Sequence, residues 1–597
     1  MKTAQRRKSW LYLVLLFAAC TVVYGLLSTY PRELAVYSDE VRYLDIARSL
    51  FQGRGLRVRN MPSDYQKILY PLCILPALAF RTTAAQITAV GWLNAAWASS
   101  AVFPACALAR ATGQSRRRTA FLVGVTALLP TMAACATFMS ETVFLPLSLW
   151  QVYFLWRAMA AASPRARAGW CAVAGAWCYL LYLNKEVALY YLIAWVLLRL
   201  WVVWNDRRVW RAELAGTAAL LGAFAACFLA GKLTLFAGLG NSYNQTGWLN
   251  AAQWAFLPFA VACDVLFTVL AFGVFPVLAP LCALRRPRPG SDPRRTQLPL
   301  LLLLALGAGV GVVAWSITVR EDLGSPSPRQ HMRYLEPLLV PLLLVTLDAL
   351  DGALTPARRR LLAALTALWG AGFLLLCRDI GPGAGDNTFL QWYDFVADRL
   401  DRLPLLGAGG WLLAWRCAVV AGAALLGVLL VRRKARRPLA LAALALCALC
   451  YAGEWRINRW TYGVDAAAVQ AASSLNETLK TLEGAVLFIP NGVRGRDSQL
   501  IDTYIDRDVY LCEYETLCAW GLLDDGVLDL TAEAPGPEYP GRPYRDLTGA
   551  DWVLAADGVP LDTAALEPTD APCPAGYTLW HNPCRERVLF ADPAQAG

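Results

Sequence analysis

Residues 38–53 read SDEVRYLDIARSLFQG, and this polar stretch separates the first two long apolar segments of the chain. Its apolar side chains recur at the spacing of one helical face, at Val41, Leu44, Ala47 and Phe51. The spacing predicts a short amphipathic helix that lies along a membrane surface rather than across the membrane. Asp39 and Glu40 fall in its first turn, where carboxylates are also favoured simply because they face the positive end of the helix dipole.

Outside this stretch the chain is strongly apolar. Of its 597 residues, 57% are hydrophobic and 17% are charged, whereas soluble domains average about 25% charged residues. A large membrane-embedded part is therefore indicated. A spanning helix needs about 20 apolar residues. Thirteen segments qualify: 10–30, 84–110, 119–138, 140–158, 168–184, 186–204, 213–236, 255–284, 297–319, 334–354, 359–377, 410–431 and 438–454.

Basic residues occupy every second connection between these segments. The clusters are the N-terminus, 116–118, 157–167, 207–211, 285–295, 358–360 and 432–437. Because Lys and Arg accumulate in cytoplasmic loops, we expect a multi-pass protein of the cytoplasmic membrane with its N-terminus inside and its C-terminus outside. The segments then expected outside are 31–83, 237–254, 320–333, 378–409 and 455–597. The apolar piece 68–80 is too short to span and is expected to lie in the outer leaflet.

The distribution of charge divides the chain into two regions. Residues 1–454 carry 45 Lys/Arg against 22 Asp/Glu, whereas residues 455–597 carry 10 against 22. We therefore predict a membrane domain over 1–454, which includes a first outer loop at 31–83, and a small outer α/β domain over 455–597. In the second domain we expect a helix at 466–482, strands at 486–490 and 552–555, and a loop at 535–543. Because the positive charge belongs to the membrane loops, it does not indicate nucleic-acid binding.

The predicted outer domain contains four cysteines, Cys512, Cys518, Cys573 and Cys584. An even number of cysteines in an oxidising space is consistent with disulfides, and the pairs Cys512–Cys518 and Cys573–Cys584 are reasonable candidates. Other pairings are equally compatible with the sequence alone. The cysteines of the membrane domain lie singly in apolar segments, where a thiol behaves as a small hydrophobic group.

The first outer loop contains two runs that carry a family resemblance. They read Asp39-Glu40-x-Arg42-Tyr43-x-x-Ile46-Ala47-Arg48 and Tyr65-Gln66-Lys67-Ile68-Leu69-Tyr70-Pro71. Together they resemble the first extracytoplasmic loop of the GT-C fold glycosyltransferases, and most closely the lipid A aminoarabinose transferase and protein O-mannosyltransferase group. The resemblance implies a multispanning enzyme with a polyprenyl-phosphate sugar as donor. It further implies that Asp39 is the general base, that Lys67 contacts the donor phosphate, and that Glu141 at a second outer turn faces the active cavity.

The chemistry of sugar transfer suits these residue types. A carboxylate within hydrogen-bond reach can take the proton of an acceptor hydroxyl as that hydroxyl attacks the anomeric carbon. The departing lipid phosphate is already anionic, so cations rather than a general acid would stabilise it. The candidate residues are therefore Asp39 as the base and Glu40, Tyr43, Lys67, Glu141, Lys185 and Arg333 as substrate-binding residues.

Most of these residues also have a purely structural explanation. Lys67 can extend to the membrane surface from an apolar position, and Glu141 stands at a helix boundary, where a charge costs little. Lys185 can pair with its neighbour Glu186. Three arginines near one predicted helix start can attract anionic lipid headgroups instead of a substrate phosphate: Arg320, Arg329 and Arg333.

The sequence contains no recognisable metal motif. His331 is one of two histidines and has no partner ligands at metal-site spacing, so we assign no metal-binding residues. The expected cofactor-like molecule is the lipid-linked sugar donor, and a divalent metal stays open without support from the sequence. Asp264 lies inside an apolar span, where acids are often functional, and the sequence assigns it no role.

The resulting hypothesis is a bacterial inverting glycosyltransferase. It would move a sugar from a polyprenyl-phosphate donor to a glycan, lipid or protein acceptor at the outer face of the cytoplasmic membrane. One alternative is a transporter or flippase of lipid-linked sugars, which would favour broken helices near the middle of the bilayer. Another is a non-catalytic cell-envelope assembly factor, whose function would depend on residues after 455 and not on Asp39.

Overall fold

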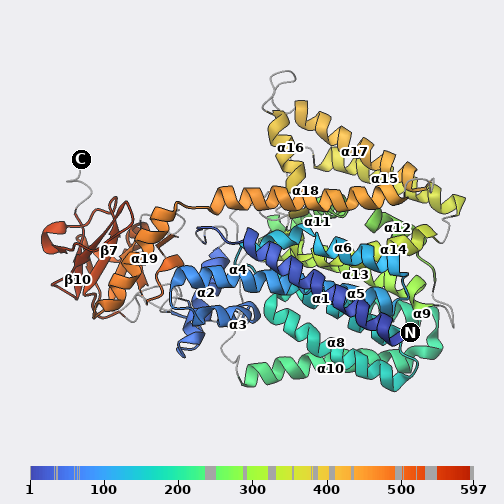
Figure 1. Cartoon of the computed structure of the whole chain (residues 1–597), viewed down its shortest axis with the longest axis horizontal. Helices are drawn as coiled ribbons and strands as arrows, with labels where there is room; N and C mark the ends of the chain where they lie inside the picture. Colours follow the sequence, from blue (N-terminus) through green and yellow to red (C-terminus); the bar gives the residue numbers. More distant parts are fainter. Residues whose placement is uncertain are drawn as a thin grey trace.

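The computed structural model describes residues 2–32, 34, 38–58, 61–63, 65, 67–234, 250–286, 292–320, 331–351, 355–377, 380, 388–401, 410–431, 436–490, 500–501, 503–507, 509–519, 521–531 and 547–591. Most of the chain forms a helical bundle, and a small α/β domain lies beyond one end of it (Figure 1). The chain is therefore an α-helical multispanning membrane protein with a C-terminal α/β domain, as predicted.

The described residues of the bundle and its first loop form α-helices, short 3-10 segments, one short π-helical segment (η6) and one β-hairpin. The first loop holds α2 (Ser38–Phe51), β1 (Arg57–Val58), β2 (Met61–Pro62), α3 (Leu69–Ile74) and η1 (Leu75–Ala79). The bundle holds α1 (Lys2–Leu27), α4 (Thr83–Ser99), α5 (Val102–Ala111), α6 (Arg116–Ala127), η2 (Pro130–Ala136), α7 (Glu141–Met159), α8 (Pro164–Asn184), η3 (Glu186–Leu189), α9 (Tyr190–Asn205), η4 (Arg207–Val209), α10 (Trp210–Leu233), α11 (Ala251–Ala271), α12 (Phe275–Ala283), α13 (Pro293–Trp315), η6 (Ser316–Arg320), η7 (Met332–Tyr334), η8 (Glu336–Leu338), α14 (Leu339–Asp351), α15 (Pro356–Leu376), η10 (Thr388–Leu390), α16 (Gln391–Asp401), α17 (Gly410–Val431) and α18 (Arg436–Tyr462).

Eight helical segments of the described chain are long and apolar enough to cross a membrane: 10–27, 116–136, 186–205, 207–233, 251–271, 293–319, 356–376 and 410–429. Each of them coincides with one of the thirteen predicted spans. The other five predicted spans are also helical, as α4 with α5, α7, α8, α14 and α18, but these helices are not among the eight. The count of thirteen and the orientation in the membrane therefore stay predictions.

The helix predicted along the membrane surface is α2, which begins at Ser38 as the sequence indicates. The apolar piece 68–80 forms the short helix of α3 and η1, which is too short to span. Tyr70 and Ile74 of this short helix are fully buried. The first loop is thus a packed layer over the end of the bundle and holds α2 in a defined position.

The helix α18 runs through the predicted boundary at residue 454 and leads directly to the α/β domain (Figure 1). That domain contains α19 (Ala466–Thr481), α21 (Tyr514–Ala519), η11 (Thr563–Ala565) and two sheets. One sheet has the order β4 (Tyr510–Leu511), β3 (Val486–Ile489), β7 (Trp552–Ala556), β9 (Tyr577–His581) and β8 (Glu567–Pro568). The other has the order β10 (Arg587–Leu589), β6 (Val527–Asp529) and β5 (Leu523–Asp524).

The strands expected from the sequence at 486–490 and 552–555 are β3 and β7, and they pair in parallel at the centre of the larger sheet. All four residues of β3 are buried, which explains why its sequence reads as a continuous apolar run rather than an alternating one. The expected helix at 466–482 is α19. The loop expected at 535–543 lies outside the described residues.

All seventeen cysteines lie in the described part of the chain, and all are free thiols. The disulfides considered for Cys512, Cys518, Cys573 and Cys584 are therefore not formed. The physical reason is visible in their surroundings, because Cys512 is buried in the core of the α/β domain whereas Cys518 and Cys584 are exposed. The domain is held together by its apolar core instead.

The helices α8 and α10 pack closely at Gly175, where a Cβ atom would overlap the backbone carbonyl of Leu220. Small residues allow such close approach of helices in membranes. Gly169, on the same helix, has no heavy atom within 4 Å of an added Cβ.

We expect Gly175→Ala to lower the midpoint of thermal unfolding in detergent, because the overlap with backbone costs about 1–3 kcal/mol. The matched control is Gly169→Ala, which should leave the midpoint unchanged or raise it, since alanine is the better helix former. Equal midpoints for the two variants would contradict the close packing of α8 on α10.

Candidate active site

Asp39 stands in the first turn of α2, and three groups of the first loop surround its carboxylate. The hydroxyl of Tyr65 donates a hydrogen bond to Oδ1 at 2.8 Å. The Nζ atom of Lys67 lies 3.6 Å from Oδ2, and a guanidinium nitrogen of Arg42 lies 3.9 Å from Oδ1. The side chain of Asp39 remains 22% exposed, whereas that of Lys67 is only 4% exposed. Asp39 is thus a partly accessible carboxylate held by a buried cation.

These neighbours decide the charge state of Asp39. Burial alone would raise the pKa of its carboxyl group. The positive charge of Lys67 and the hydrogen bond from Tyr65 act in the opposite direction, and with smaller effects from Arg42 and Lys185 they lower the pKa to about 2. The carboxyl group is therefore ionised throughout the physiological range of pH and can accept a proton.

A second charged cluster surrounds Glu141, the first residue of α7. Glu141 is 4% exposed. The Nζ atom of Lys185 donates a hydrogen bond to its Oε1 at 2.9 Å, and the Nε atom of Arg333 lies 3.1 Å from the same oxygen. Its second oxygen, Oε2, has no hydrogen-bond partner among the described residues. The cluster therefore contains a buried carboxylate oxygen that can still accept a hydrogen bond.

The two clusters lie close to one another. The charge of Lys185, a partner of Glu141, is among the influences that lower the pKa of Asp39. Tyr334 interacts with cations of both clusters. The centre of its ring lies 4.1 Å from the Nζ atom of Lys185, and the charge of Lys67 acts on its hydroxyl group. The end of the bundle near α2 thus brings together two carboxylates and four cations.

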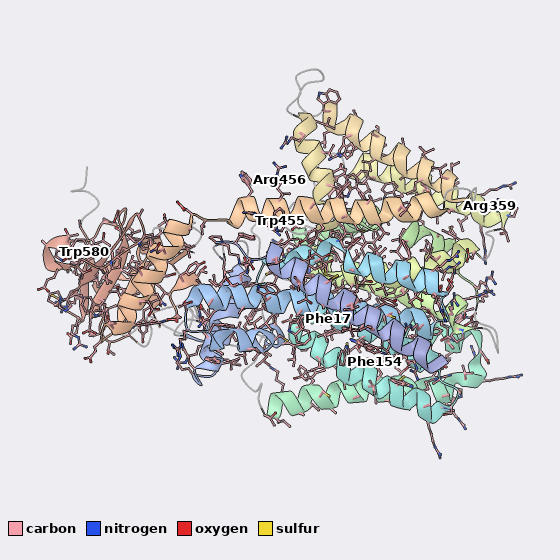
Figure 2. The ribbon with its side chains drawn as sticks, viewed as in Figure 1. Phe17, Phe154, Arg359, Trp455, Arg456 and Trp580 are labelled. Atoms are coloured by element: carbon pink, nitrogen blue, oxygen red, sulfur yellow. The ribbon has the colours of Figure 1, made fainter. Side chains whose placement is uncertain are left out.

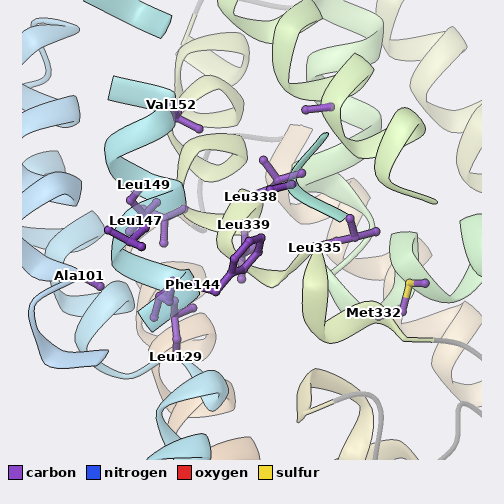
Figure 3. Packing of buried hydrophobic residues seen from close by; sticks show 14 of the residues in the cluster. Ala101, Leu129, Phe144, Leu147, Leu149, Val152, Met332, Leu335, Leu338 and Leu339 are labelled. Atoms are coloured by element: carbon purple, nitrogen blue, oxygen red, sulfur yellow. The ribbon is translucent and has the colours of Figure 1, made fainter. Parts of the chain in front are cut away.

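The elements that carry these residues are fixed by packing and by backbone contacts. Residues of α7, of η8 and of the start of α14 share one buried apolar cluster, which includes Phe144, Leu147, Leu338 and Leu339 (Figure 3). This packing holds the turn with Arg333 against the helix that begins with Glu141. The side chain of Asn184 also donates a hydrogen bond to the carbonyl of Ser140, which joins the end of α8 to the start of α7.

Glu40 and Tyr43 are buried, so the contacts that the structure gives them are with protein. The carboxylate of Glu40 accepts a hydrogen bond from the backbone N–H of Phe138 at 2.7 Å. Tyr43 is fully buried, packs against the ring of Tyr70, and directs its hydroxyl toward Oγ of Ser140 at 3.4 Å. Both residues therefore tie α2 to the turn before α7, and a direct contact with substrate stays a prediction.

The opposite face of α2 contacts the α/β domain. Arg48 is 5% exposed and donates hydrogen bonds to the carbonyls of Thr503 at 2.8 Å and Ile505 at 3.1 Å. Arg48 follows Asp39 by nine positions, which places the two on opposite sides of the helix. Nearby, the hydroxyl of Tyr504 donates to the carbonyl of Arg32 at 3.1 Å. We call the contacts of Arg48 with residues 503 and 505 the α2 clamp.

The remaining candidate residues are less informative. The ring of His331 stacks on that of Tyr334 with 5.7 Å between the ring centres. No group of three or more His, Cys, Asp or Glu among the described residues could hold a metal ion. Arg329 and the side chain of Arg320 lie outside the described residues.

The structure brings the predicted residues Asp39, Lys67, Glu141, Lys185 and Arg333 to one place. It also adds residues that had no assigned role, namely Tyr65, Arg42, Tyr334 and Arg48. Tyr65 and Arg42 stand within the quoted motifs and Tyr334 follows the candidate Arg333, so their proximity could have been anticipated. No sequence signal relates Arg48 to residues 503 and 505, because the contact joins positions more than 450 residues apart.

No family model matches the sequence, and no significant match exists among curated proteins. Solved structures do match. ArnT from Cupriavidus metallidurans in the apo state is 17% identical, covers 96% of this chain and 98% of its own, and superposes with a TM-score of 0.51. The same protein bound to undecaprenyl phosphate gives 16% identity, the same coverage and a TM-score of 0.49. The apo oligosaccharyltransferase of Archaeoglobus fulgidus gives 12% identity, 92% and 70% coverage and a TM-score of 0.39. The likeness to apo ArnT confirms the GT-C fold expected from the sequence.

We expect Glu141→Gln to lower the thermal stability of the protein, because the change leaves the buried cations Lys185 and Arg333 without their carboxylate. Removing one partner of a buried ion pair costs about 3–5 kcal/mol. The measurement is the midpoint of thermal unfolding in detergent. The control is Glu477→Gln, because the side chain of Glu477 is 64% exposed and pairs only at the surface. A loss no larger than in this control would show that the Glu141 cluster is not a stabilising element.

Proposed function

We propose that the protein is an inverting glycosyltransferase that moves a sugar from a polyprenyl-phosphate donor to an acceptor hydroxyl at the outer face of the cytoplasmic membrane. The observation that carries the proposal is the ionised, partly exposed carboxylate of Asp39 beside a buried group of cations. The acceptor would be a glycan, a lipid or a protein. The shared fold with ArnT is compatible with this function, but the argument rests on the residues of the site.

In the proposed reaction the acceptor oxygen attacks the anomeric carbon of the sugar while the bond from that carbon to the phosphate oxygen breaks. The electron pair of the broken bond leaves with the polyprenyl phosphate, which gains one negative charge. The acceptor proton passes to Asp39, which later releases it to water. Attack on the side opposite to the leaving phosphate inverts the anomeric configuration.

The cations of the site suit the departing phosphate. Lys67, Lys185 and Arg333 are held at the same end of the bundle, each beside Asp39 or Glu141. Buried cations stabilise developing negative charge strongly because little water screens them. Glu141 keeps Lys185 and Arg333 in position, and its unpaired Oε2 can accept a hydrogen bond from a sugar hydroxyl.

A base with a pKa of about 2 is weak, and the geometry suggests how its strength rises during the reaction. Lys67 is the largest single influence that lowers the pKa of Asp39. When a donor phosphate competes for Lys67, the carboxylate loses part of this stabilisation and its pKa rises. Asp39 would thus become a better base only when the donor is bound.

A lipid-linked sugar transporter is the second candidate function, and one region favours it. Asp264 in α11 is 1% exposed, and neither carboxylate oxygen has a hydrogen-bond partner among the described residues. The helix ends seven residues later, and Gly273 and Val274 adopt positive φ before α12 begins. Broken helices and buried acids are typical of transport sites. Transport of a labelled lipid-linked sugar across the membrane of proteoliposomes, without cleavage of the sugar from its carrier, would support this candidate.

We expect Asp39→Asn to reduce transfer by about 10²–10⁴-fold, because asparagine cannot take the acceptor proton. The assay incubates purified protein with a panel of polyprenyl-phosphate sugars and acceptors and follows release of the carrier by mass spectrometry. Donor binding, measured separately, should persist in the variant. Full turnover by Asp39→Asn would exclude Asp39 as the base, and no carrier release with any donor would argue against the transferase.

We expect the acid limb of the kcat/KM profile to move to higher pH in Lys67→Met. In the wild type Asp39 is ionised above about pH 2, so its protonation limits activity only at very low pH. Without Lys67, burial raises the pKa, and activity is lost at a higher pH as the solution is acidified. Arg42→Gln should shift the limb less, because Arg42 has the smaller effect. Superimposable profiles for wild type and Lys67→Met would contradict the assignment.

A further inference from the structure

A hollow opens at the end of the bundle opposite to α2, where α12, α13, α14 and α15 meet. It is shallow and open to solvent, with a cavity volume of about 40 Å³, and is lined by both basic and apolar residues. In the ribbon view α12 and α14 lie at the far side of the bundle from α2 (Figure 1). Arg359, which follows a lining residue in the sequence, marks the same end of the molecule (Figure 2). The hollow is therefore separate from the candidate active site.

The lining is strongly basic. It includes four arginines and a single carboxylate: Arg285, Arg294, Arg295, Arg358 and Asp348. The carboxylate is already occupied, because the guanidinium of Arg294 contacts both of its oxygens and the side chain of Gln114 donates to them at 3.1 and 3.2 Å. Asp348 therefore orients Arg294 but cannot neutralise the other three arginines.

The arginines differ in how firmly they are held. A guanidinium nitrogen of Arg358 donates to the carbonyl of Leu284 at 3.3 Å, which fixes this side chain at the wall. Arg285 and Arg295 are exposed, and neither forms an ion pair with a carboxylate of the described residues. Two fixed and two free guanidinium groups thus converge on one concave surface, a geometry that suits an anion with several oxygen atoms.

The rest of the lining is apolar and indicates the source of the anion. The wall contains Pro280, Ala283, Pro299, Val345 and Ala349. A free phosphate ion gains nothing from such a wall, whereas a phospholipid whose phosphate contacts the arginines can lay its glycerol and upper acyl carbons against this apolar surface. Basic pockets between membrane helices are known to receive lipid headgroups.

We propose that this hollow is a binding site for a phosphate group, supplied by the headgroup of an anionic phospholipid. The site does not depend on the transferase activity. Positive charge at a membrane surface is common and attracts anionic lipids diffusely, and the connection between α9 and α10 provides the comparison. Arg207 and Arg208 in that connection are exposed and do not line the hollow. The proposal requires that Arg285 and Arg295 bind lipid in a way that Arg207 and Arg208 do not.

The test compares two double variants that each remove two exposed arginines, Arg285→Gln with Arg295→Gln and Arg207→Gln with Arg208→Gln. Native mass spectrometry of the full chain in detergent would measure binding of phosphatidylglycerol and of phosphatidylcholine, and a separate arm would use inorganic phosphate. We expect tight phosphatidylglycerol binding that weakens at least about ten-fold in the first variant only. Phosphatidylcholine binding should be weak in all three proteins.

Each other outcome counts against the proposal or narrows it. Equal loss of phosphatidylglycerol binding in both double variants would show diffuse attraction and overturn the proposal. No selectivity between the two lipids would overturn it as well. Binding of inorganic phosphate that disappears in the first variant, without lipid binding, would keep the phosphate site and overturn the lipid as its source. Unfolding midpoints of the variants would confirm that both remain folded.

Discussion

The pairing of buried charges is the constraint on which the architecture near α2 depends. A carboxylate or ammonium group that leaves water without a partner costs several kcal/mol. Glu141, Lys185 and Arg333 come from α7, the end of α8 and η7, and each can be buried only because the others are present. The requirement adds a directional constraint to the apolar packing that already holds these elements together. The same arrangement leaves one carboxylate oxygen of Glu141 without a hydrogen-bond partner among the described residues, so the stabilising cluster retains a buried acceptor.

Asp39 and Glu141 both lie beside cations, but their carboxylates differ in exposure to solvent. Asp39 retains exposed surface and faces the first loop, whereas Glu141 is enclosed by cations and core. Environment rather than residue type therefore separates a group able to exchange protons from a group that mainly orders its neighbours. Asp39 in turn depends on the placement of α2, which is held on one side by the turn before α7 and on the other by the α2 clamp.

Local patterns predicted the fold well. The apolar lengths located helices at all thirteen segments, and the helical spacing of residues 38–53 located α2. Motif resemblance selected Asp39, Glu141 and Lys67, and the expected positions at the outer face added Lys185 and Arg333. The errors and omissions concern contacts between residues that are far apart in the sequence or that depend on burial, which local patterns do not encode. The even number of cysteines in the outer domain suggested disulfides. Cys512, however, is buried in the core of the α/β domain, whereas Cys518 is exposed. The partners of Arg48 are backbone carbonyls, which any residue type can provide, so the sequence does not identify them. The arginines of the basic hollow come together only when four helices are packed, so the sequence does not predict the hollow either.

The α2 clamp joins positions more than 450 residues apart in the chain, so Arg48 is synthesised long before its acceptors at 503 and 505. During synthesis α2 would emerge first, and the clamp could form only after the intervening helices and residues 503 and 505 have been made. The order of translation thus delays the full support of α2 until this part of the α/β domain is present. A product that ends before residue 503 would carry every residue around Asp39 and still lack the α2 clamp.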